Sequence, residues 1–404
     1  METQNQTLIF PPQFFWGCAT SAHQIEGGLI NDWSEWEKSP TRLAELAKKQ
    51  LDPQDFISGA AADSYVNNNA DIYCLKELGV NAYRFSVDWS RIEPEEGKFN
   101  EEALAHYLEF IKKLRANKIE PLVTLWHWPL PLWLKDRGGW ENKYTIKAFG
   151  GFVKQVTTYL NSEVNFWITL NEPLVYTSQS YLAGEWPPQK KNPLAAWRVI
   201  NNLAAAHQLA YGIIKNIDND NQVGIAKHNI YFAAANNSLI NRVLKYGADW
   251  WWNFRFLDKL KGYQDFIGLN YYFHNLINYG FGRSYHYDKH SDLQWGLYPE
   301  GIYYLLKDLK KYNLPIYITE NGLADKGDQH RSWYIQEILR STLRAINEGV
   351  MVKGYFHWSL IDNFEWSHGF APRFGLYEVN YQTFERVARP SAQFYADICR
   401  NNRI

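Results

Sequence analysis

Two glutamates in this sequence stand where apolar, strand-like runs end. Glu172 closes the run "FWITLNE" (166–172), and Glu320 lies near the end of "PIYITEN" (315–321). A glutamate at such a point can belong to a surface turn, and each residue taken alone allows that explanation. Two glutamates at equivalent strand ends favour another explanation. In it, two carboxyl groups converge on one substrate and divide acid, base or nucleophilic roles between them.

A pair of converging carboxyl groups has a well-defined use in glycoside hydrolysis. One carboxylic acid protonates the leaving oxygen, while an ionised partner faces the positively charged sugar carbon. The two roles require different environments, because the acid must keep its proton near neutral pH. Asn171, beside Glu172, offers an amide to a sugar hydroxyl, and Arg84 in "AYRFSV" is suited to keep a nearby carboxylate charged.

Eight short strand-like runs must position these residues: 14–21, 81–87, 121–127, 166–172, 223–228, 266–272, 315–321 and 353–359. Helical patterns lie between them, such as 101–116 and 333–347. Eight β and α repeats in 404 residues predict an α/β fold, a (β/α)8 TIM barrel that forms a single domain over residues 1–404. The fourth and seventh strands would then deliver Glu172 and Glu320 to the same barrel mouth.

A doubly wound open sheet is the alternative architecture. Such a sheet normally carries a glycine-rich phosphate-binding turn after its first strand. Here the first run continues into "ATSAHQIEGG", which favours the barrel. We expect residues 273–299 to form an irregular loop after the sixth strand.

The overall composition argues against several classes of protein. Lys plus Arg number 42 and Asp plus Glu number 43, so no global field attracts nucleic acid. The absence of a long apolar run and of a secretory pattern predicts no membrane association and a cytoplasmic protein. Cys18, Cys74 and Cys399 are expected to be packed thiols. Aromatic residues make up 17% of the chain, and their faces suit sugar rings.

Several motifs together resemble glycoside hydrolase family 1, the β-glucosidase and β-glycosidase family. They are "FFWGCATSAHQIEGG", "NAYRFSVDWSRIEP", "EPLVTLWHWPLPLWL", "WITLNEP", "DFIGLNYY", "IYITENGLAD" and "GYFHWSLIDNFEW", in the family's order over residues 10–395. The resemblance implies a retaining β-glycosidase on a (β/α)8 barrel. Glu172 would be its general acid/base and Glu320 its nucleophile, with their carboxyl groups about 5 to 5.5 Å apart.

The resemblance also implies a sugar-binding site without a cofactor or a metal. Arg84 and Tyr272 would orient the nucleophile. The substrate-binding residues would be Gln24, His127, Asn171, Asn270, Tyr272, Trp358, Glu365, Trp366 and Phe374. Hydroxyl groups would meet the amides, imidazole and carboxylate, while the Trp358 indole would cover the C–H face of the ring.

The expected reaction is exo-acting hydrolysis with retention, by double displacement through a covalent glycosyl-enzyme. The substrates would be terminal non-reducing β-D-glucosyl residues, and also galactosyl or fucosyl residues, of β-glucosides and short oligosaccharides. Pro129 and His357 stand where many β-glucosidases have other residues, and both resemble the broad-specificity glycosidases of the family.

Two other functions stay open. A catalytically weak or inactive carbohydrate-binding barrel would use the same fold, although such proteins lack one or both glutamates. A metal-dependent hydrolase would need ligands such as His286, Asp288 and His290 of "HYDKH", which are more often a solvated polar stretch.

Overall fold

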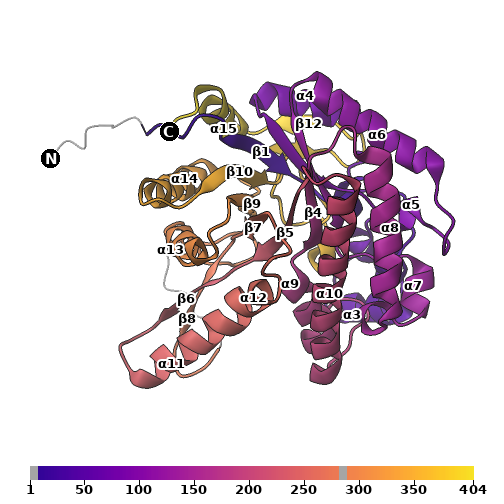
Figure 1. The fold of residues 1–404 in the computed structure, drawn as a ribbon, viewed down its shortest axis with the longest axis horizontal. Coiled ribbons are helices and arrows are strands. Elements are labelled where there is room, and N and C mark those ends of the chain that lie inside the picture. Colours follow the sequence, from indigo (N-terminus) through magenta and orange to yellow (C-terminus); the bar gives the residue numbers. More distant parts are fainter. Residues whose placement is uncertain (1–7, 282–288) are drawn as a thin grey trace.

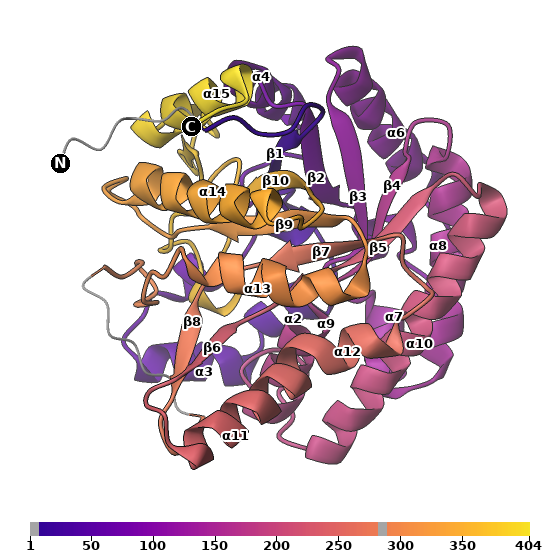
Figure 2. The ribbon, with the colours of Figure 1, turned by 60° about the vertical axis from the view of Figure 1, so that its left-hand side comes forward.

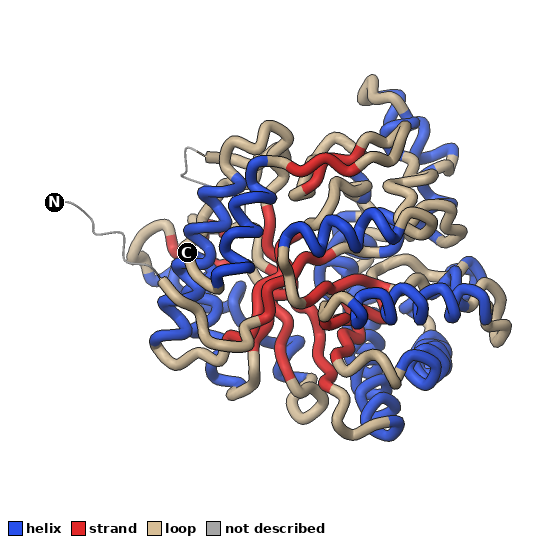
Figure 3. Tube along the Cα trace, turned by 90° about the horizontal axis from the view of Figure 1, so that it is seen from above, coloured by secondary structure: helices blue, strands red, loops and turns tan. Residues whose placement is uncertain are grey.

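The computed structural model describes residues 8–281 and 289–404, and its centre is a closed barrel of eight parallel strands. Figure 3 shows the strands in the middle of the molecule with helices outside them. The barrel strands are β1 (Phe15–Ala19), β2 (Ala82–Ser86), β3 (Glu120–Trp126), β4 (Phe166–Asn171), β5 (Gln222–His228), β7 (Phe266–Asn270), β9 (Ile316–Gly322) and β10 (Val352–Trp358). All eight predicted strands are confirmed, each within two residues at either end.

Closure of the sheet separates this fold from the doubly wound alternative. The strand order is β1-β10-β9-β7-β5-β4-β3-β2, and β10 pairs with β1 from Phe15↔Gly354 to Ala19↔Trp358. An open sheet would leave β1 or β10 at an edge. The predicted TIM barrel is therefore confirmed.

Helices cover the outside of the barrel (Figure 1). The longer ones are α3 (Pro40–Lys48), α4 (Asn68–Leu78), α6 (Glu101–Ala116), α8 (Tyr144–Leu160), α10 (Pro193–Ile217), α11 (Leu239–Ala248), α13 (Gly301–Leu309), α14 (Arg331–Asn347) and α15 (Pro390–Asn401). The predicted helix at 101–116 has these bounds, and it begins where the Asn100 side chain accepts a bond from the Ala103 amide. The helix expected at 333–347 starts two residues earlier, at Arg331.

Short elements connect the barrel units. They are α1 (Ala22–Ile25), α2 (Asp32–Glu37), α5 (Trp89–Ile92), α7 (Leu132–Asp136), α9 (Pro173–Thr177), α12 (Arg255–Lys259), the 3-10 turns Pro53–Phe56, Gly139–Glu141, Lys310–Tyr312 and Trp366–His368, and the π-helical turns Ser178–Ala183 and Asp249–Phe254. A two-stranded antiparallel sheet joins β11 (Tyr377–Val379) and β12 (Arg386–Ala388).

Aromatic rings fill the barrel interior. Phe15 of β1 and Phe166 of β4 lie 5.5 Å apart between ring centroids, although their strands are not neighbours in the barrel. Space there is tight, because a Cβ on Gly17 would lie 2.4 Å from the Phe356 ring and one on Gly224 would lie 2.5 Å from the Phe266 ring. The glycines in these strands are thus needed for the close approach of the rings.

One part of the fold differs from the sequence-based expectation. A parallel pair, β6 (Tyr231–Ala234) and β8 (His274–Ile277), projects with α11 from one side of the barrel (Figures 1 and 2). The sequence predicted no strand at 231–234 and an irregular loop at 273–299. Four-residue strands that pair only with each other carry too short a pattern to be recognised. Residues 282–288 of the predicted loop lie outside the described residues.

Cys18, Cys74 and Cys399 are free and buried, as predicted. None of the helices in the two described ranges combines the length and the apolar character that a membrane crossing needs.

Candidate active site

A cavity of about 890 Å³ opens at the carboxyl ends of the barrel strands. Nine of the twelve predicted site residues line it: Gln24, His127, Glu172, Tyr272, Glu320, Trp358, Glu365, Trp366 and Phe374. The other three, Arg84, Asn171 and Asn270, are fully buried and bond to the lining residues from below. The structure therefore brings all twelve predicted residues together.

Glu320, in β9, has a strong partner on each carboxylate oxygen. The Arg84 guanidinium donates to Oε1, and the Tyr272 hydroxyl donates to Oε2 over 2.7 Å. Arg84 and Glu320 are both buried, so their ion pair lies away from the screening of bulk water. The ion pair and the phenol hydrogen bond together fix both oxygens of this carboxylate.

Arg84 also ties neighbouring strands to this carboxylate. Its Nη2 donates to Asn171 Oδ1 in β4 over 2.7 Å, and its Nε donates to Thr124 Oγ1 in β3 over 3.1 Å. The planar guanidinium presents five fixed donors, which a lysine cannot do. One side chain from β2 therefore holds the ends of β3, β4 and β9 in fixed relative positions.

Glu172, directly after β4, has a different environment. Its backbone is left-handed, with φ 43° and ψ 57°, and its amide donates to Ala226 O over 2.8 Å. Oε1 accepts a bond of 2.7 Å from Asn270 Nδ2, and Thr319 Oγ1 orients that amide by donating to Asn270 Oδ1 over 2.7 Å. Burial and the nearby Glu320 charge raise the pKa of Glu172 to about 8.

Gln24, Glu365 and His127 are further polar residues that line the cavity. Gln24 Nε2 lies 3.2 Å from Glu365 Oε2 and donates to Phe364 O over 2.9 Å. His127 Nε2 lies 3.0 Å from Asn171 Nδ2, and burial together with Arg84 lowers the pKa of His127 well below its usual value. Since the amide nitrogen can only donate, Nε2 accepts and the proton of the neutral ring is on Nδ1.

Comparison with known proteins decides the family. The sequence profile of Glycosyl hydrolase family 1 matches residues 6–256 and 255–404. The chain belongs to this family.

Relatives of this family 1 chain match it over nearly its whole length. The curated β-glucosidase A of Thermotoga maritima is 33% identical, with 97% of this chain and 98% of the relative covered. The β-galactosidase of Pyrococcus woesei is 31% identical, with 98% of each chain covered. The chain is thus a glycosidase of the β-glucosidase and β-glycosidase type.

Solved structures of family 1 members share this fold. The β-glycosidase from Pyrococcus horikoshii superimposes with a TM-score of 0.90 at 38% identity, over 99% of this chain and 96% of that one. A β-glucosidase from Thermotoga maritima in complex with glucoimidazole gives a TM-score of 0.90 at 31% identity, over 98% of this chain and 99% of that one.

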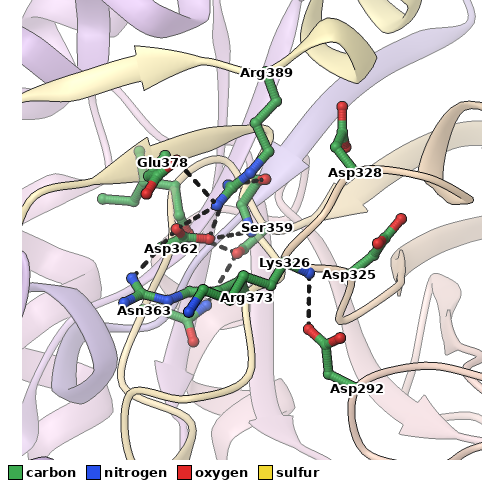
Figure 4. Close-up of polar contacts among 12 residues, drawn as sticks. Asp292, Asp325, Lys326, Asp328, Ser359, Asp362, Asn363, Arg373, Glu378 and Arg389 are labelled. Atoms are coloured by element: carbon green, nitrogen blue, oxygen red, sulfur yellow. Dashed lines mark hydrogen bonds and ion pairs between the residues drawn. The ribbon is translucent and has the colours of Figure 1, made fainter.

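A buried charge network supports the cavity wall of this family 1 enzyme (Figure 4). Arg389 donates two hydrogen bonds, of 3.0 and 2.8 Å, to the Asp362 carboxylate. Arg373 Nη1 lies 3.4 Å from Asp362 Oδ2. Asn363, the next residue, donates to Ser359 Oγ over 3.0 Å and accepts from Gln24 Nε2 over 3.2 Å. The loop that carries Glu365 is therefore tied to the end of β10.

Sequence reasoning missed several residues of this site. Thr124, Thr319 and Asn363 orient the predicted residues without lining the cavity, and only their contacts reveal this. His228 is different, because it lines the cavity and ends the apolar run "VGIAKH" as Glu172 ends its own run. The rule of polar strand ends would have found it.

The two departures from the family pattern lie outside the cavity. Neither Pro129 nor His357 belongs to its lining. Pro129 O accepts a bond of 3.0 Å from Trp126 Nε1, and His357 is fully buried with Nδ1 3.3 Å from the Tyr355 hydroxyl. Any effect of these residues on the substrate must act through their neighbours.

Candidate metal ligands do not gather at one place in the described residues. The described part of this family 1 chain holds no group of three or more His, Cys, Asp or Glu side chains that could bind a metal ion. His286 and Asp288 of the candidate motif lie outside the described residues. The prediction of a metal-free reaction therefore stays a prediction.

Proposed function

We propose that this enzyme is a retaining, exo-acting β-glycosidase in which Glu320 is the nucleophile and Glu172 the general acid/base. The observation that carries this proposal is the unequal environment of two carboxyl groups in one cavity. Arg84 and Tyr272 each donate to one carboxylate oxygen of Glu320, whereas burial and the nearby Glu320 raise the pKa of Glu172 to about 8. An ionised nucleophile and a protonated acid are what the first half of a double displacement requires.

In the first step, a Glu320 oxygen bonds to the anomeric carbon as the glycosidic C–O bond breaks. The Glu172 proton moves to the leaving oxygen, so the aglycone departs as a neutral alcohol. In the second step the Glu172 carboxylate takes a proton from water, whose oxygen displaces Glu320 from the sugar. Two inversions at carbon give net retention, and direct attack requires the carboxyl groups to be about 5 to 5.5 Å apart.

The residues proposed to bind the glycone line the cavity or, for Asn171 and Asn270, bond directly to residues that do. Gln24, Glu365, His127 and Asn171 offer donors and acceptors to hydroxyl groups, and the Trp358 indole offers an apolar face. Tyr272, Trp366 and Phe374 complete the wall, and Asn270 holds Glu172. Each is a proposed substrate-binding residue.

The substrates we propose are β-D-glucosides and short β-linked oligosaccharides, cut at the terminal non-reducing residue. Galactosides and fucosides are included, and a relative named a β-galactosidase supports this breadth. The cavity volume of about 890 Å³ lies within the range of small-molecule sites and accommodates an aglycone beyond the first sugar.

The test is hydrolysis of a panel of aryl β-glycosides with the first-formed product anomer read by NMR. Release of the β-anomer supports the proposal, whereas the α-anomer would show inversion. A folded protein that turns over none of these substrates between pH 4 and 8, yet binds them, would instead be a carbohydrate-binding barrel.

We also infer that residues 1–404 form a single domain, because the last barrel strand pairs with the first and Leu8 pairs with Ile404 near the two ends. A cytoplasmic location is proposed as well. Three free, buried thiols are in keeping with a reducing compartment.

A further inference from the structure

The Tyr272 hydroxyl can donate to Glu320 only while its ring keeps one orientation, and other rings surround it. The Trp295 ring meets it at 5.9 Å between centroids, with 66° between the planes, and the Phe374 ring at 6.2 Å and 82°. Trp295 and Phe374 lie 6.3 Å apart, and the His228 ring stacks on Tyr272 at 6.2 Å. The direction of the phenol O–H is thus fixed by side chains from other segments.

Trp295 belongs to a narrow hairpin, residues 289–297, that lies between β8 and α13. The Leu297 amide donates to Lys289 O over 3.0 Å, and the Ser291 amide donates to Trp295 O over 2.9 Å. The Trp295 amide in turn donates to Ser291 Oγ over 3.1 Å. Because these bonds close the hairpin on itself, the place of the Trp295 ring depends on what the hairpin is attached to.

Asp292 attaches this hairpin to the loop that follows β9. Its amide donates to Ala324 O over 2.8 Å, and its Oδ2 accepts a bond of 2.8 Å from the Lys326 amide (Figure 4). Ala324 packs in the same buried cluster as Tyr272. The segment next to the strand of Glu320 therefore also holds the hairpin that carries Trp295.

The same loop holds the turn that carries Phe374. The Asp325 amide donates to Arg373 O over 2.9 Å. Arg331 Nη2 donates to Arg373 O over 2.9 Å and to Asp325 O over 2.7 Å. Both rings that pack on the edges of the phenol, Trp295 and Phe374, are therefore anchored to one loop.

We propose that Asp292 is a positioning residue, which holds Trp295 against Tyr272 and so keeps the Tyr272 hydroxyl on Glu320. The inference rests on the nucleophile role proposed for Glu320. In the second step the bond between Glu320 and the anomeric carbon breaks, and its electron pair returns to the carboxylate, which the phenol hydrogen bond stabilises. Asp292 makes and breaks no covalent bond and does not belong to the cavity lining.

The test measures the second step directly. Dinitrophenyl 2-deoxy-2-fluoro-β-glucoside is the probe, because its fluorine slows both steps and its good leaving group lets the first step proceed, so that the glycosyl-enzyme accumulates. Mass spectrometry shows the intermediate, and the return of activity gives the rate of its breakdown. The aglycone has left at that stage, so Trp295 cannot act by contact with it.

Three variants carry the comparison. Asp292→Ala removes the acceptor, both in the wild-type chain and combined with Tyr272→Phe, while Asp292→Asn keeps an oxygen that can accept from the Lys326 amide. Asp292 is exposed, so these substitutions leave no hole in the core. The matched control is Asp218→Ala, because the Asp218 side chain also accepts from one backbone amide, that of Asp220 over 3.0 Å, and neither residue lines the cavity.

Asp292→Ala should slow breakdown of the intermediate about fivefold, the typical net effect of one hydrogen bond. It should have no further effect in Tyr272→Phe, since no phenol O–H is left to be positioned. Asp292→Asn and Asp218→Ala should keep the wild-type rate. An unchanged rate in Asp292→Ala, or an equal loss with and without the Tyr272 hydroxyl, would overturn the inference.

Trp295→Leu tests the same route from its other end. It removes the ring from Tyr272 and should slow breakdown at least as much as Asp292→Ala, again without further effect in Tyr272→Phe. An equal loss in both chains would overturn the inference, even if thermal unfolding showed that Asp292→Ala does not fold. Failure of the proposed function is a separate result, because the wild type would then form no glycosyl-Glu320.

Discussion

The ends of β4 and β9 carry the same side chain in opposite surroundings. Glu320 is bonded by a guanidinium and a phenol, both of which favour its negative charge. Glu172 has one amide on Oε1 and faces the charge of Glu320 across the cavity. The strands around each end, rather than the glutamate itself, thus determine which carboxyl group is ionised.

Removing the Glu320 carboxylate at the end of β9 should have the largest effect on activity. Glu320→Ala is expected to lower kcat by about 10⁵-fold, since no group remains to form the covalent intermediate. Added azide should restore part of the activity and give the α-glycosyl azide. The measurement is the anomeric configuration of that product by NMR, and a β-configured azide would contradict the nucleophile assignment.

Substitution of the two side chains that donate to Glu320 tests how much each contributes to its role in catalysis. Arg84→Met should lower kcat/KM by about 10²- to 10³-fold, the cost of losing a buried charged donor at a reacting group. Tyr272→Phe removes one neutral donor and should cost less. Thr145→Val is the control, because it removes a buried hydroxyl that donates to Gly139 O, and neither residue lines the cavity. Equal losses in Tyr272→Phe and Arg84→Met would show that charge is not the decisive factor.

The effect of replacing Glu172 should depend on the leaving group of the substrate. Glu172→Gln is expected to slow the first step by about 10²- to 10⁴-fold with poor leaving groups such as alkyl β-glucosides. Dinitrophenyl glycosides need no protonation, so their glycosylation rate should change little. Stopped-flow measurement of the dinitrophenolate burst separates the steps. A burst slowed as much as alkyl glucoside turnover would exclude the acid role.

Glu365, another buried acid in the cavity, is expected to have a smaller effect, which concerns the stability of the folded state. Burial and Glu320 raise the pKa of Glu365 from 4.5 to about 8. The folded state therefore binds this proton more tightly than the unfolded state, and the contribution is fully present below pH 4.5 and lost as pH rises toward 8.

Glu365→Gln should remove this pH dependence. Its Tm should exceed that of the wild type by about 2 °C or more at pH 8 and by little at pH 4.5. Calorimetry at both pH values is the measurement, with the exposed Glu385→Gln as control. A Tm gain that is the same at both pH values would contradict the raised pKa.

The sequence predicted the barrel because each of its eight strands is a buried apolar run, and two of those runs end in Glu172 and Glu320. It did not assign the two roles from the residues alone, because both glutamates follow similar apolar, strand-like runs. Those roles came from the resemblance to family 1. The difference between the surroundings of the two glutamates depends on Arg84 and Tyr272. Both residues lie far from Glu320 along the chain.

The residues that sequence reasoning missed share a physical cause. Thr319 and Asn363 act by orienting other side chains, and nothing in their type or spacing reveals a partner 49 or 339 residues away. The pair β6 and β8 buries Phe232 and Ile277 against Ala248 of α11, but each strand has only four residues and is too short to show an apolar pattern in the sequence. Periodicity detects a long segment that faces a core, and neither the orienting side chains nor the four-residue strands supply such a segment.

The pairing of β10 with β1 has a consequence for biosynthesis. The cavity takes Gln24 from just after the first barrel strand and Trp358 from the last, so the two halves of the sugar site emerge from the ribosome more than three hundred residues apart. A nascent chain that stops before β10 contains both glutamates yet lacks a complete sugar site. Hydrolysis by this enzyme therefore requires a chain that extends past β10 and has closed the barrel.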